Sequence, residues 1–360
     1  MDIFSGLYRD RRVMVTGHTG FKGSWLCLWL KELGAIVSGY ALPPPTNPNH
    51  FDLLSLDIAS IKGDIRDRVA LNEAFSAFEP EIVFHLAAQA LVGPSYINPV
   101  ETLETNVMGT VNVLETCRHI KSIKAVVIIT SDKCYESKHW VWSYREMDEM
   151  GGHDPYSASK GCAELITASY RRSFFSDTEN KTPFVASARA GNVIGGGDWS
   201  EFRLIPDIVR ATIENDTIYI RKPASVRPWQ HVLEPLSGYL TLGAQLLAGR
   251  REFACPWNFG PDNNSYLTVM ELIEMARKSW SIISCEIRPV DWLAEVDYLK
   301  LDCSKAAAEL AWSSVWSIET TLRRTISWYV DYYEKNVVLS HNDLYEYVKD
   351  AKARNLAYAL

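Results

Sequence analysis

Several features of membrane and nucleic-acid-binding proteins are missing from this sequence. No apolar run comes near the roughly 20 residues that a membrane-spanning helix needs, and the first residues, MDIFSGLYRDRR, lack the apolar core of a signal peptide. Lys and Arg number 37 against 44 Asp and Glu, and the net charge is −7. Nucleic-acid binding relies on clustered Lys and Arg, so this charge balance disfavours a nucleic-acid-binding protein. We therefore expect neither a membrane protein nor a nucleic-acid-binding protein.

A regular cysteine pattern is also missing. The seven cysteines are odd in number and scattered, with no C-x-x-C pair, which disfavours both a disulfide framework and a zinc site. We expect reduced, mostly buried thiols, as in a cytoplasmic protein, and no bound metal. The hydrophobic content of 47% and charged content of 22% are ordinary for a globular protein, and 360 residues allow about two domains.

A glycine-rich turn follows the first strand-like run. Residues 12–16 (RVMVT) lead into GHTGFKG, which contains Gly17, Gly20 and Gly23, and an apolar helical stretch follows. A strand, a glycine-rich turn and a helix in this order form a dinucleotide-binding unit. The glycines let the backbone approach a pyrophosphate, which rests on the positive N-terminus of the helix. The spacing is G-x-x-G-x-x-G, which differs from the simpler G-x-G-x-x-G.

Strand-like apolar runs alternate with helix-length segments along the first half of the chain. They lie near residues 12–16, 35–40, 59–63, 81–86, 125–130 and 183–188. This alternation predicts an α/β fold with a doubly wound parallel sheet of the Rossmann type. We expect a dinucleotide-binding domain over residues 1–189, and over 190–360 mainly a smaller C-terminal substrate-binding lobe, with some segments returning to the sheet. The tail from about residue 330 predicts a peripheral helix.

Tyr156 and Lys160 form a Tyr-x-x-x-Lys pair in the segment HDPYSASKGCAEL. On a helix, residues i and i+4 share a face, so the ammonium group lies near the phenol. A nearby positive charge favours the phenolate, and we expect it to lower the pKa of Tyr156 from its usual value of about 10. Such a tyrosine can take a proton from an alcohol while a hydride leaves the adjacent carbon.

The glycine loop and the Tyr–Lys pair, with several landmarks between them, make this chain resemble the extended short-chain dehydrogenase/reductase family. The landmarks are Gly63-Asp64, His85-Leu-Ala-Ala-Gln89, Asn106 and Thr130-Ser131-Asp132. The resemblance covers essentially the whole chain and implies NAD as the cofactor. It also implies the following cofactor-binding residues: Gly17, His18, Thr19, Gly20, Phe21, Lys22, Gly23, Asp64, Ile65, Leu86, Ala87, Ala88, Gln89, Asn106, Tyr156 and Lys160.

The residues after the fifth strand-like run distinguish the branches of this family. The run ends in Thr130-Ser131-Asp132-Lys133, where sugar-nucleotide 4,6-dehydratases usually have Thr-Asp-Glu and 4-epimerases Ser-Ser or Ser-Thr. The resemblance therefore implies dehydration, with Asp132 as the general acid and these catalytic residues: Ser131, Asp132, Lys133, Tyr156 and Lys160. Lys133 stands where the family has a glutamate base. It can act as a base or stay charged and stabilise an enolate, and the sequence leaves both open.

Two further segments resemble the parts of the family that bind a nucleotide sugar. RAGNVIG contains Asn192, and RPWQHV contains Arg227 and His231. The resemblance implies that these three residues and Ser131 bind substrate, and guanidinium groups suit phosphate oxygens. Strings such as GHTGFKGSWL and TSDKCYE are closer to the branch that acts on CDP-D-glucose, in dideoxyhexose and O-antigen synthesis, than to those that act on dTDP-glucose or GDP-mannose.

The resemblance also implies a homodimer or homotetramer that pairs through the helix of the Tyr–Lys motif. Cys162, Leu165, Ile166 and Ala168 are consistent with a paired face on that helix, though they could equally pack on the sheet.

Some alternatives stay open. No acidic residue lies between Glu32 and Asp52, where a carboxylate usually holds the ribose of NAD, so the choice between NAD and NADP is weakly determined. A sugar-nucleotide 4-epimerase is one alternative function, although epimerisation needs no acid such as Asp132. A non-catalytic, NAD-binding regulatory protein is a second, and the presence of Ser131, Tyr156 and Lys160 argues against it.

Overall fold

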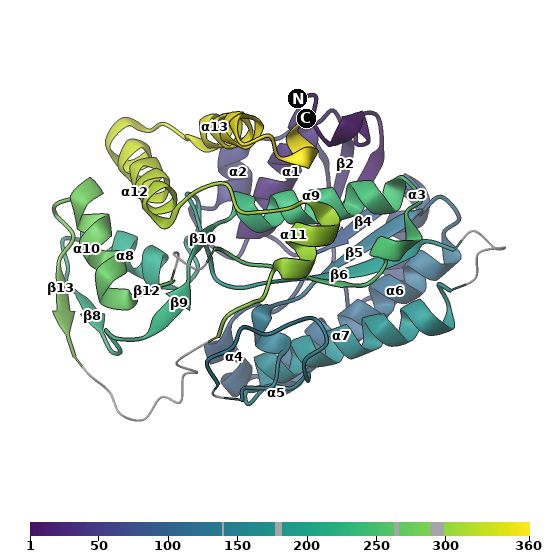
Figure 1. Ribbon diagram of the computed structural model, residues 1–360, viewed down its shortest axis with the longest axis horizontal. Coiled ribbons are helices and arrows are strands. Elements are labelled where there is room, and N and C mark those ends of the chain that lie inside the picture. Colours follow the sequence, from purple (N-terminus) through teal and green to yellow (C-terminus); the bar gives the residue numbers. More distant parts are fainter. Residues whose placement is uncertain (139, 177–181, 263–265, 289–298) are drawn as a thin grey trace.

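A seven-stranded sheet forms the centre of the computed structural model, which describes residues 1–138, 140–176, 182–262, 266–288 and 299–360 (Figure 1). The strand order is β11-β6-β5-β4-β1-β2-β3, and all pairs are parallel. The strands are β1 (Arg12–Thr16), β2 (Ile36–Ala41), β3 (Ala59–Lys62), β4 (Ile82–His85), β5 (Ala125–Ile129), β6 (Phe184–Ala190) and β11 (Pro256–Phe259). The first six match the predicted runs, so the predicted parallel α/β sheet is confirmed.

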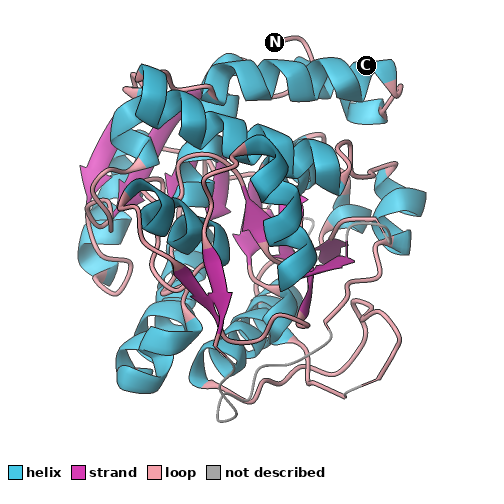
Figure 2. Cartoon of the chain, turned by 90° about the vertical axis from the view of Figure 1, so that its left-hand side faces the viewer, coloured by secondary structure: helices cyan, strands magenta, loops and turns pink. Residues whose placement is uncertain are grey.

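Helices cover both faces of this sheet, as Figures 1 and 2 show. Side chains alternate along β1, so that Val13 and Val15 join one apolar cluster and Met14 joins another. The first cluster lies under α1 (Phe21–Glu32), α9 (Leu233–Leu247), α11 (Ser304–Leu310) and α13 (Ser340–Ala353). The second lies under α3 (Arg68–Phe78), α6 (Gly109–His119) and α7 (Pro155–Ser173). The parallel sheet is therefore buried on both faces.

A smaller lobe has an apolar cluster of its own, at the left of Figure 1. The cluster is built by α8 (Leu204–Ile213), α10 (Val269–Ser279) and α12 (Ile318–Lys335). Short strands pair around it: β7 (Val193–Ile194) with β10 (Gln230–His231), β9 (Val226–Pro228) with β12 (Tyr266–Thr268), and β8 (Ile218–Ile220) with β13 (Cys285–Ile287). Later segments such as β11 return to the main sheet. The domain boundary at 189/190 stays a prediction.

Short elements complete the chain. The remaining α-helices are α2 (His50–Leu54), α4 (Val92–Ile97) and α5 (Pro99–Leu103). Single turns of other helix types are η1 (Phe4–Gly6), η2 (Glu104–Met108), η3 (Asp132–Cys134), η4 (Arg251–Phe253) and η5 (Ala357–Ala359). Of these, η2 and η3 lie beside the candidate site.

The sequence predicted a peripheral helix for the C-terminal tail, but the tail packs into the core. It forms the end of α12 and the whole of α13, and Tyr347 of α13 is fully buried. The Tyr347 hydroxyl donates a hydrogen bond to Glu234 of α9 at 2.7 Å. Beyond α13, Tyr358 stacks on Phe4 at 5.3 Å, so the two ends of the chain lie side by side (Figure 1). The alternation of charged and aromatic residues marked a helix correctly, but its aromatic face packs into the core.

The structure bears on three expectations drawn from composition: the state of the cysteines, a metal site and a membrane-spanning helix. All seven cysteines are free thiols. Among the described residues, no cluster of three or more His, Cys, Asp or Glu side chains could hold a metal ion. The described helices also include none that combines the length and the apolar character needed to cross a membrane.

Candidate active site

The glycine loop between β1 and α1 is held in close contact with its surroundings. Gly17 has a φ of +77°, which favours glycine, and a Cβ there would lie 2.7 Å from the Ala87 nitrogen. A Cβ on Gly23 would lie 2.1 Å from the Gly17 carbonyl oxygen. Any side chain at either position would push the loop away from β4 or from the first turn of α1. The backbone therefore forms a cradle at a helix N-terminus, which fits a dinucleotide pyrophosphate.

The side chain of His18 anchors this loop to β2 and β3, and its imidazole ring is neutral. Its side chain is 1% exposed, packs over Gly39 of β2, and forms a 2.7 Å hydrogen bond between Nε2 and Ser60 Oγ. Burial lowers the pKa of His18 to about 4. His18 therefore carries no positive charge for a phosphate at neutral pH. Thr19 donates a hydrogen bond to the Leu42 carbonyl at 2.8 Å, which ties the loop to the segment after β2.

The segment after β4 is tied to α7 by Asn106. The Asn106 side chain accepts from the Gln89 nitrogen at 2.8 Å and donates to the Gln89 carbonyl at 2.9 Å and to Ser159 Oγ at 2.8 Å. Its exposed fraction is only 1%. Asn106 was predicted to bind cofactor, but its carboxamide is already used by these protein groups, so the structure gives it a supporting position. Leu86, Ala87, Ala88 and Gln89 remain partly exposed along this edge.

At the end of β3, Asp64 and Ile65 face different surroundings. The carboxylate of Asp64 pairs with Arg66 at 2.6 Å, and this hydrogen-bonded partner lowers the pKa of Asp64. The side chain of Ile65 is 4% exposed and packs toward Gly109 in the core beneath the sheet. Only Asp64 therefore presents its side chain at this edge, while Ile65 belongs to the core.

Tyr156 and Lys160 lie in the first turns of α7, as predicted. The helix begins at Pro155, and Asp154 caps it by accepting a 2.9 Å hydrogen bond from the Ser157 nitrogen. The Lys160 Nζ atom lies 6.0 Å from the centre of the Tyr156 ring. Both side chains are almost fully buried. The next residue, Gly161, lets η3 approach, since a Cβ there would lie 3.3 Å from the Cys134 carbonyl oxygen.

The pKa shift predicted for Tyr156 has the wrong sign. Burial raises the pKa of Tyr156 to about 12; a hydrogen bond with Ser131 and the charge of Arg203 oppose the rise. Burial also lowers the pKa of Lys160 to about 8. The i, i+4 spacing placed the two groups correctly, but it gave no information about how little water reaches them. In the ligand-free protein, Tyr156 is therefore a neutral phenol.

Ser131, Asp132 and Lys133 form the turn that follows β5. Ser131 Oγ accepts a 3.2 Å hydrogen bond from the Lys133 nitrogen and donates one of 2.8 Å to Asp132 Oδ1. Asp132 is 4% exposed, and burial raises its pKa although the charge of Lys133 opposes the rise. A carboxyl group with a raised pKa holds its proton more readily at neutral pH. Asp132 is therefore suited to donate a proton.

The predicted substrate-binding residues Ser131, Asn192 and Arg227 come from segments at this edge, and so does His231, but the His231 side chain is buried. Gly191 touches both segments: a Cβ there would lie 2.9 Å from Asp132 Oδ2 and 3.3 Å from Pro228. The neighbouring Asn192 is exposed and Arg227 partly exposed.

His231 is fully buried, with ring contacts to Trp25 at 5.9 Å and Trp316 at 4.8 Å. The predicted contact between His231 and substrate is therefore replaced by a packing role. Burial lowers the pKa of His231 to about 3, which is consistent with a neutral core residue.

Arg203 is a site residue that the sequence reasoning missed. It precedes α8, donates a 2.9 Å hydrogen bond to Asp198, and its charge acts on both Tyr156 and Lys22. Lys22 in turn has its pKa lowered to about 7 by burial and by the charges of Arg203 and Lys160, while Asp132 opposes the fall. Asp198 and Arg203 lie in an irregular loop, so no periodic pattern marked them. The only signal was an arginine five residues after GGGD.

The fold and the site together define an oxidoreductase-type scaffold. A glycine cradle after β1, a Tyr–Lys pair on α7 and a Ser–Asp–Lys turn after β5 meet at the carboxyl edge of one parallel sheet. This is the edge at which open α/β sheets bind their ligands. The site therefore suits a dinucleotide and a hydroxyl-bearing substrate placed side by side.

Comparison with known proteins gives the family. A family model described as GDP-mannose 4,6 dehydratase matches residues 14–250. The chain is 51% identical over 336 residues to the CDP-glucose 4,6-dehydratase of Salmonella typhimurium, covering 91% of this chain and 92% of that protein. The chain belongs to this family of nucleotide-sugar dehydratases and related epimerases, with the fold of extended short-chain dehydrogenases/reductases.

Solved structures agree on the fold. An epimerase from Methanothermobacter thermautotrophicus superposes with a TM-score of 0.81 at 24% identity, over 95% of this chain and 98% of that one. A dTDP-glucose 4,6-dehydratase from Streptomyces venezuelae, solved with NAD bound, has a TM-score of 0.75 at 25% identity, over 90% and 98%. Because the fold serves both epimerases and dehydratases, the choice between them depends on the side chains of the site.

Replacing Lys160 should stabilise the protein. The folded-state pKa of about 8 lies below the unfolded value of 10.5, so burying the ammonium costs free energy at neutral pH, and wild-type stability rises as the pH increases from about 8 to 10.5. Lys160→Met should raise the free energy of unfolding at pH 7 by roughly 2–3 kcal/mol and remove this rise. Urea unfolding of the wild type and the variant at pH 7 and pH 10 measures the free energy of unfolding and its change with pH. A less stable variant at pH 7 would contradict the assigned cost of burial.

Proposed function

We propose that this protein is a lyase that converts CDP-D-glucose to CDP-4-keto-6-deoxy-D-glucose by internal redox and loss of water, with NAD as the cofactor. One observation carries the dehydratase assignment: Asp132, a buried carboxyl group with a raised pKa, accepts a hydrogen bond from Ser131, the residue that also opposes the rise in the pKa of Tyr156. An epimerase needs no such acid. The nucleobase and the sugar rest on the 51% identity to the Salmonella dehydratase.

The residues of the cradle fit NAD. The closely packed glycines Gly17 and Gly23 leave the loop backbone free to bind a pyrophosphate, and Asp64, whose carboxylate pairs with Arg66, lies partly exposed at the end of β3 for the adenosine part. NAD held by these residues would supply reversible hydride transfer, with carbon 4 of the sugar as the hydride donor and carbon 6 as the acceptor. We prefer NAD over NADP because the dehydratase from Streptomyces venezuelae was solved with NAD.

In the first half of the reaction, Tyr156 in its ionised form accepts the proton of the 4-hydroxyl group, and a pKa of about 12 makes this the minor form at neutral pH. Its hydrogen bond with Ser131 and the nearby charge of Arg203 stabilise the phenolate that this transfer requires, against the cost of burial. Lys160 sits one helical turn further along α7 and contributes positive charge below its pKa of about 8. The 4-ketone that results acidifies the proton on carbon 5.

In the second half, Asp132 protonates the departing 6-hydroxyl group, which leaves as water. Its raised pKa keeps a larger fraction of this carboxyl protonated than an exposed aspartate would have. Lys133 lies next to it in the same turn, where it either removes the carbon-5 proton or stabilises the enolate oxygen. Arg227 and Asn192, with Arg203, offer donors for the diphosphate.

A homodimer is the assembly that the surface supports. Several large apolar side chains are exposed on α4, α5, η2 and the adjoining face of α7: Tyr96, Ile97, Val100, Leu103, Met108 and Leu165. An exposed patch of this kind, on adjacent helices, marks an interaction surface. Of the four positions predicted on α7, Leu165 is exposed, Cys162 and Ala168 are partly exposed, and Ile166 instead packs toward the core beneath the sheet.

The product keeps its nucleotide and carries a ketone, so it suits a following transferase or reductase step. We place the reaction in the cytoplasm and in dideoxyhexose synthesis for O-antigen lipopolysaccharide. The free thiols are consistent with a reducing compartment, and the pathway rests on the resemblance to CDP-D-glucose enzymes.

Mass spectrometry of the product tests the proposed function. Incubation with CDP-D-glucose and NAD should give a product lighter by one water, whereas epimerisation leaves the mass unchanged. Tyr156→Phe should lower turnover by about 10²–10⁴-fold, because the phenol is the acid–base group at carbon 4, while cofactor binding stays near wild type. Unchanged product mass, or near-wild-type turnover by the variant, would contradict the assignment.

Asp132 and Lys133 should matter after carbon 4 is oxidised. Asp132→Asn cannot protonate the leaving hydroxyl, and Lys133→Met can neither accept the carbon-5 proton nor stabilise an enolate. Both variants should still exchange hydride at carbon 4 but release little dehydrated sugar. Solvent-deuterium exchange at carbon 5 divides the roles of the two residues: loss of exchange in the lysine variant alone supports Lys133 at the deprotonation step, as base or as stabiliser of the enolate, and Asp132 at the later loss of water. Normal release of dehydrated product by both variants would rule out this mechanism.

The dimer is tested by a charge placed within the exposed patch. Leu165→Glu should convert the protein to a monomer in sedimentation velocity at micromolar concentration, because a carboxylate would be buried without a partner. Val141→Glu is a matched control, since Val141 is also exposed but lies on a different segment. A wild-type protein that is already a monomer would refute the proposed assembly.

A further inference from the structure

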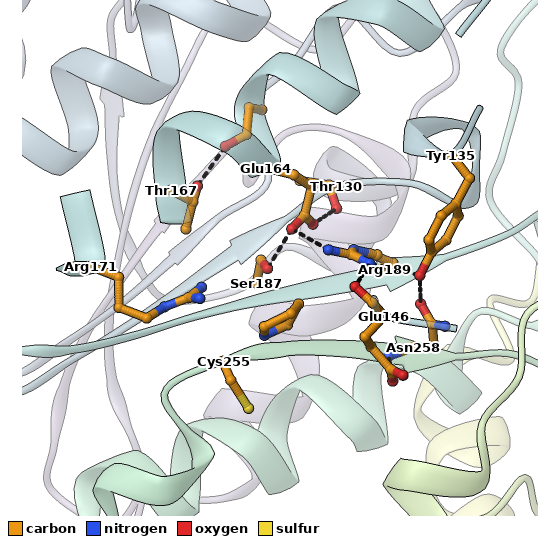
Figure 3. Close-up of polar contacts among 12 residues, drawn as sticks. Thr130, Tyr135, Glu146, Glu164, Thr167, Arg171, Ser187, Arg189, Cys255 and Asn258 are labelled. Carbon is orange, nitrogen blue, oxygen red and sulfur yellow. Dashed lines mark hydrogen bonds and ion pairs between the residues drawn. The ribbon is translucent and has the colours of Figure 1, made fainter. Parts of the chain in front are cut away.

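A fully buried ion pair lies directly behind the Tyr–Lys pair. Glu164 of α7 and Arg189 of β6 are joined by a contact of 2.8 Å between Oε2 and Nη2, and their side chains are 4% and 2% exposed. Figure 3 shows the guanidinium group of Arg189 between Glu164 on one side and Tyr135 on the other. Removing two charges from water is costly, and an apolar pair of the same size often stabilises a fold as well. Stability alone therefore does not explain this pair.

Glu164 connects the catalytic helix to the residue that follows β5 and to the middle of β6. Its Oε1 atom accepts a hydrogen bond from Thr130 Oγ1 at 2.5 Å, and its Oε2 atom accepts one from Ser187 Oγ at 2.7 Å in addition to Arg189. Thr130 is the residue immediately before Ser131. The start of the Ser131–Lys133 turn is thus fixed to the same helix that carries Tyr156 and Lys160.

Arg189 holds the other end of that turn. Its Nη1 atom donates to the Tyr135 hydroxyl at 2.7 Å and to the Glu146 carbonyl at 3.1 Å. Tyr135 follows η3 directly, and its hydroxyl donates to Asn258 of β11 at 2.8 Å. The two residues that bracket the turn, Thr130 and Tyr135, are therefore each hydrogen-bonded to one member of the pair.

Glu164 also faces Lys160, which lies four residues earlier on α7. The other titratable groups that act on Lys160 or contact it are Cys134 on η3, Lys22 on α1, His85 on β4 and Tyr156 on α7. Burial raises the pKa values of the Cys134 thiol and of Tyr156 and lowers that of His85 to about 3, so all three are neutral near pH 8. Among these groups, Glu164 is the negative charge that acts on Lys160.

Glu164 stays ionised although it is buried. Burial opposes ionisation, but the charge of Arg189 and the hydrogen bonds from Arg189, Thr130 and Ser187 hold the pKa of Glu164 below its usual value. Glu164 in turn raises the pKa of Lys160, against the larger effect of burial. The charge of Glu164 therefore favours the ammonium form of Lys160 at neutral pH.

We propose that Glu164 and Arg189 are a positioning pair for the reaction centre: they fix the helix of Tyr156 and Lys160 to the turn of Ser131, Asp132 and Lys133, and they keep a negative charge facing Lys160. This inference rests on the proposed roles of Tyr156 and Lys160. It assigns no contact with substrate to either member of the pair.

Glu164→Gln tests the charge directly, without any need for turnover. The amide keeps the size of the side chain but removes its charge, so the pKa of Lys160 should fall by roughly 0.5–1 unit. The measurement is a ¹³C NMR titration of reductively methylated lysines, with Lys160→Arg to assign the signal. In the enzyme assay with CDP-D-glucose and NAD, the loss of kcat at alkaline pH should shift to lower pH by the same amount, with KM near wild type.

Asp343→Asn is the control for loss of a buried carboxylate elsewhere in the fold, because Asp343 is buried in a second pair, Arg324–Asp343, between α12 and α13. It should leave the Lys160 titration and the pH profile of the enzyme unchanged. A Lys160 titration that is the same in Glu164→Gln and wild type would overturn the charge role. If Tyr156→Phe loses turnover while Glu164→Gln keeps the wild-type pH profile, the positioning proposal fails and the proposed function stands.

Thr130→Val tests the positional role in a milder way, since it removes one donor to Glu164 and leaves the ion pair intact. It should lower kcat by about tenfold, as expected when a proton-donating turn is slightly misplaced, while the pH profile stays in place. Should Glu164→Gln not fold, Thr130→Val still tests whether Glu164 positions the turn. Wild-type kcat in Thr130→Val would overturn the positional role of Glu164.

Discussion

The site depends on one constraint, which is that parallel strands end at the same edge of their sheet. The strand order reverses between β1 and β4, because the chain winds outward through β2 and β3 and then through β5, β6 and β11. The helices that follow β1 and β4 leave toward opposite faces, and the edge opens between them. The glycine loop, the segment after β4 and the Ser–Asp–Lys turn meet there, although the loop and the turn are more than 100 residues apart in sequence.

Burial, more than pairing, sets the protonation of the site. It raises the pKa of Asp132 and Tyr156 and lowers that of Lys160 to about 8 and of Lys22 to about 7. The pKa of Asp132 and those of the two lysines are thereby brought closer together, whereas that of Tyr156 moves away from them. Proton transfer between Asp132 and a lysine therefore needs less driving force, while the phenolate of Tyr156 depends on Ser131 and Arg203 for its stabilisation.

Local patterns in the sequence predicted the elements better than the contacts between them. Period and composition located six strands and the α7 helix, and the spacing of Gly17 and Gly23 located the cradle. The misses involve contacts between distant segments: His231 packs on Trp25 and Trp316, and Arg203 acts on Tyr156 from an irregular loop. The sign of the Tyr156 shift was wrong because desolvation depends on everything that surrounds the phenol, and a spacing rule describes only one neighbour.

The position of α13 has a consequence for how the chain folds as it is made. The Tyr347 hydroxyl of α13 and its neighbours cover α1 and α9, and Tyr358 lies against Phe4. Until residues 340–359 have left the ribosome, the apolar surface of an early helix stays exposed to water. We expect this stage of synthesis to be the one at which chaperones are needed, since exposed apolar surface promotes aggregation of incomplete chains.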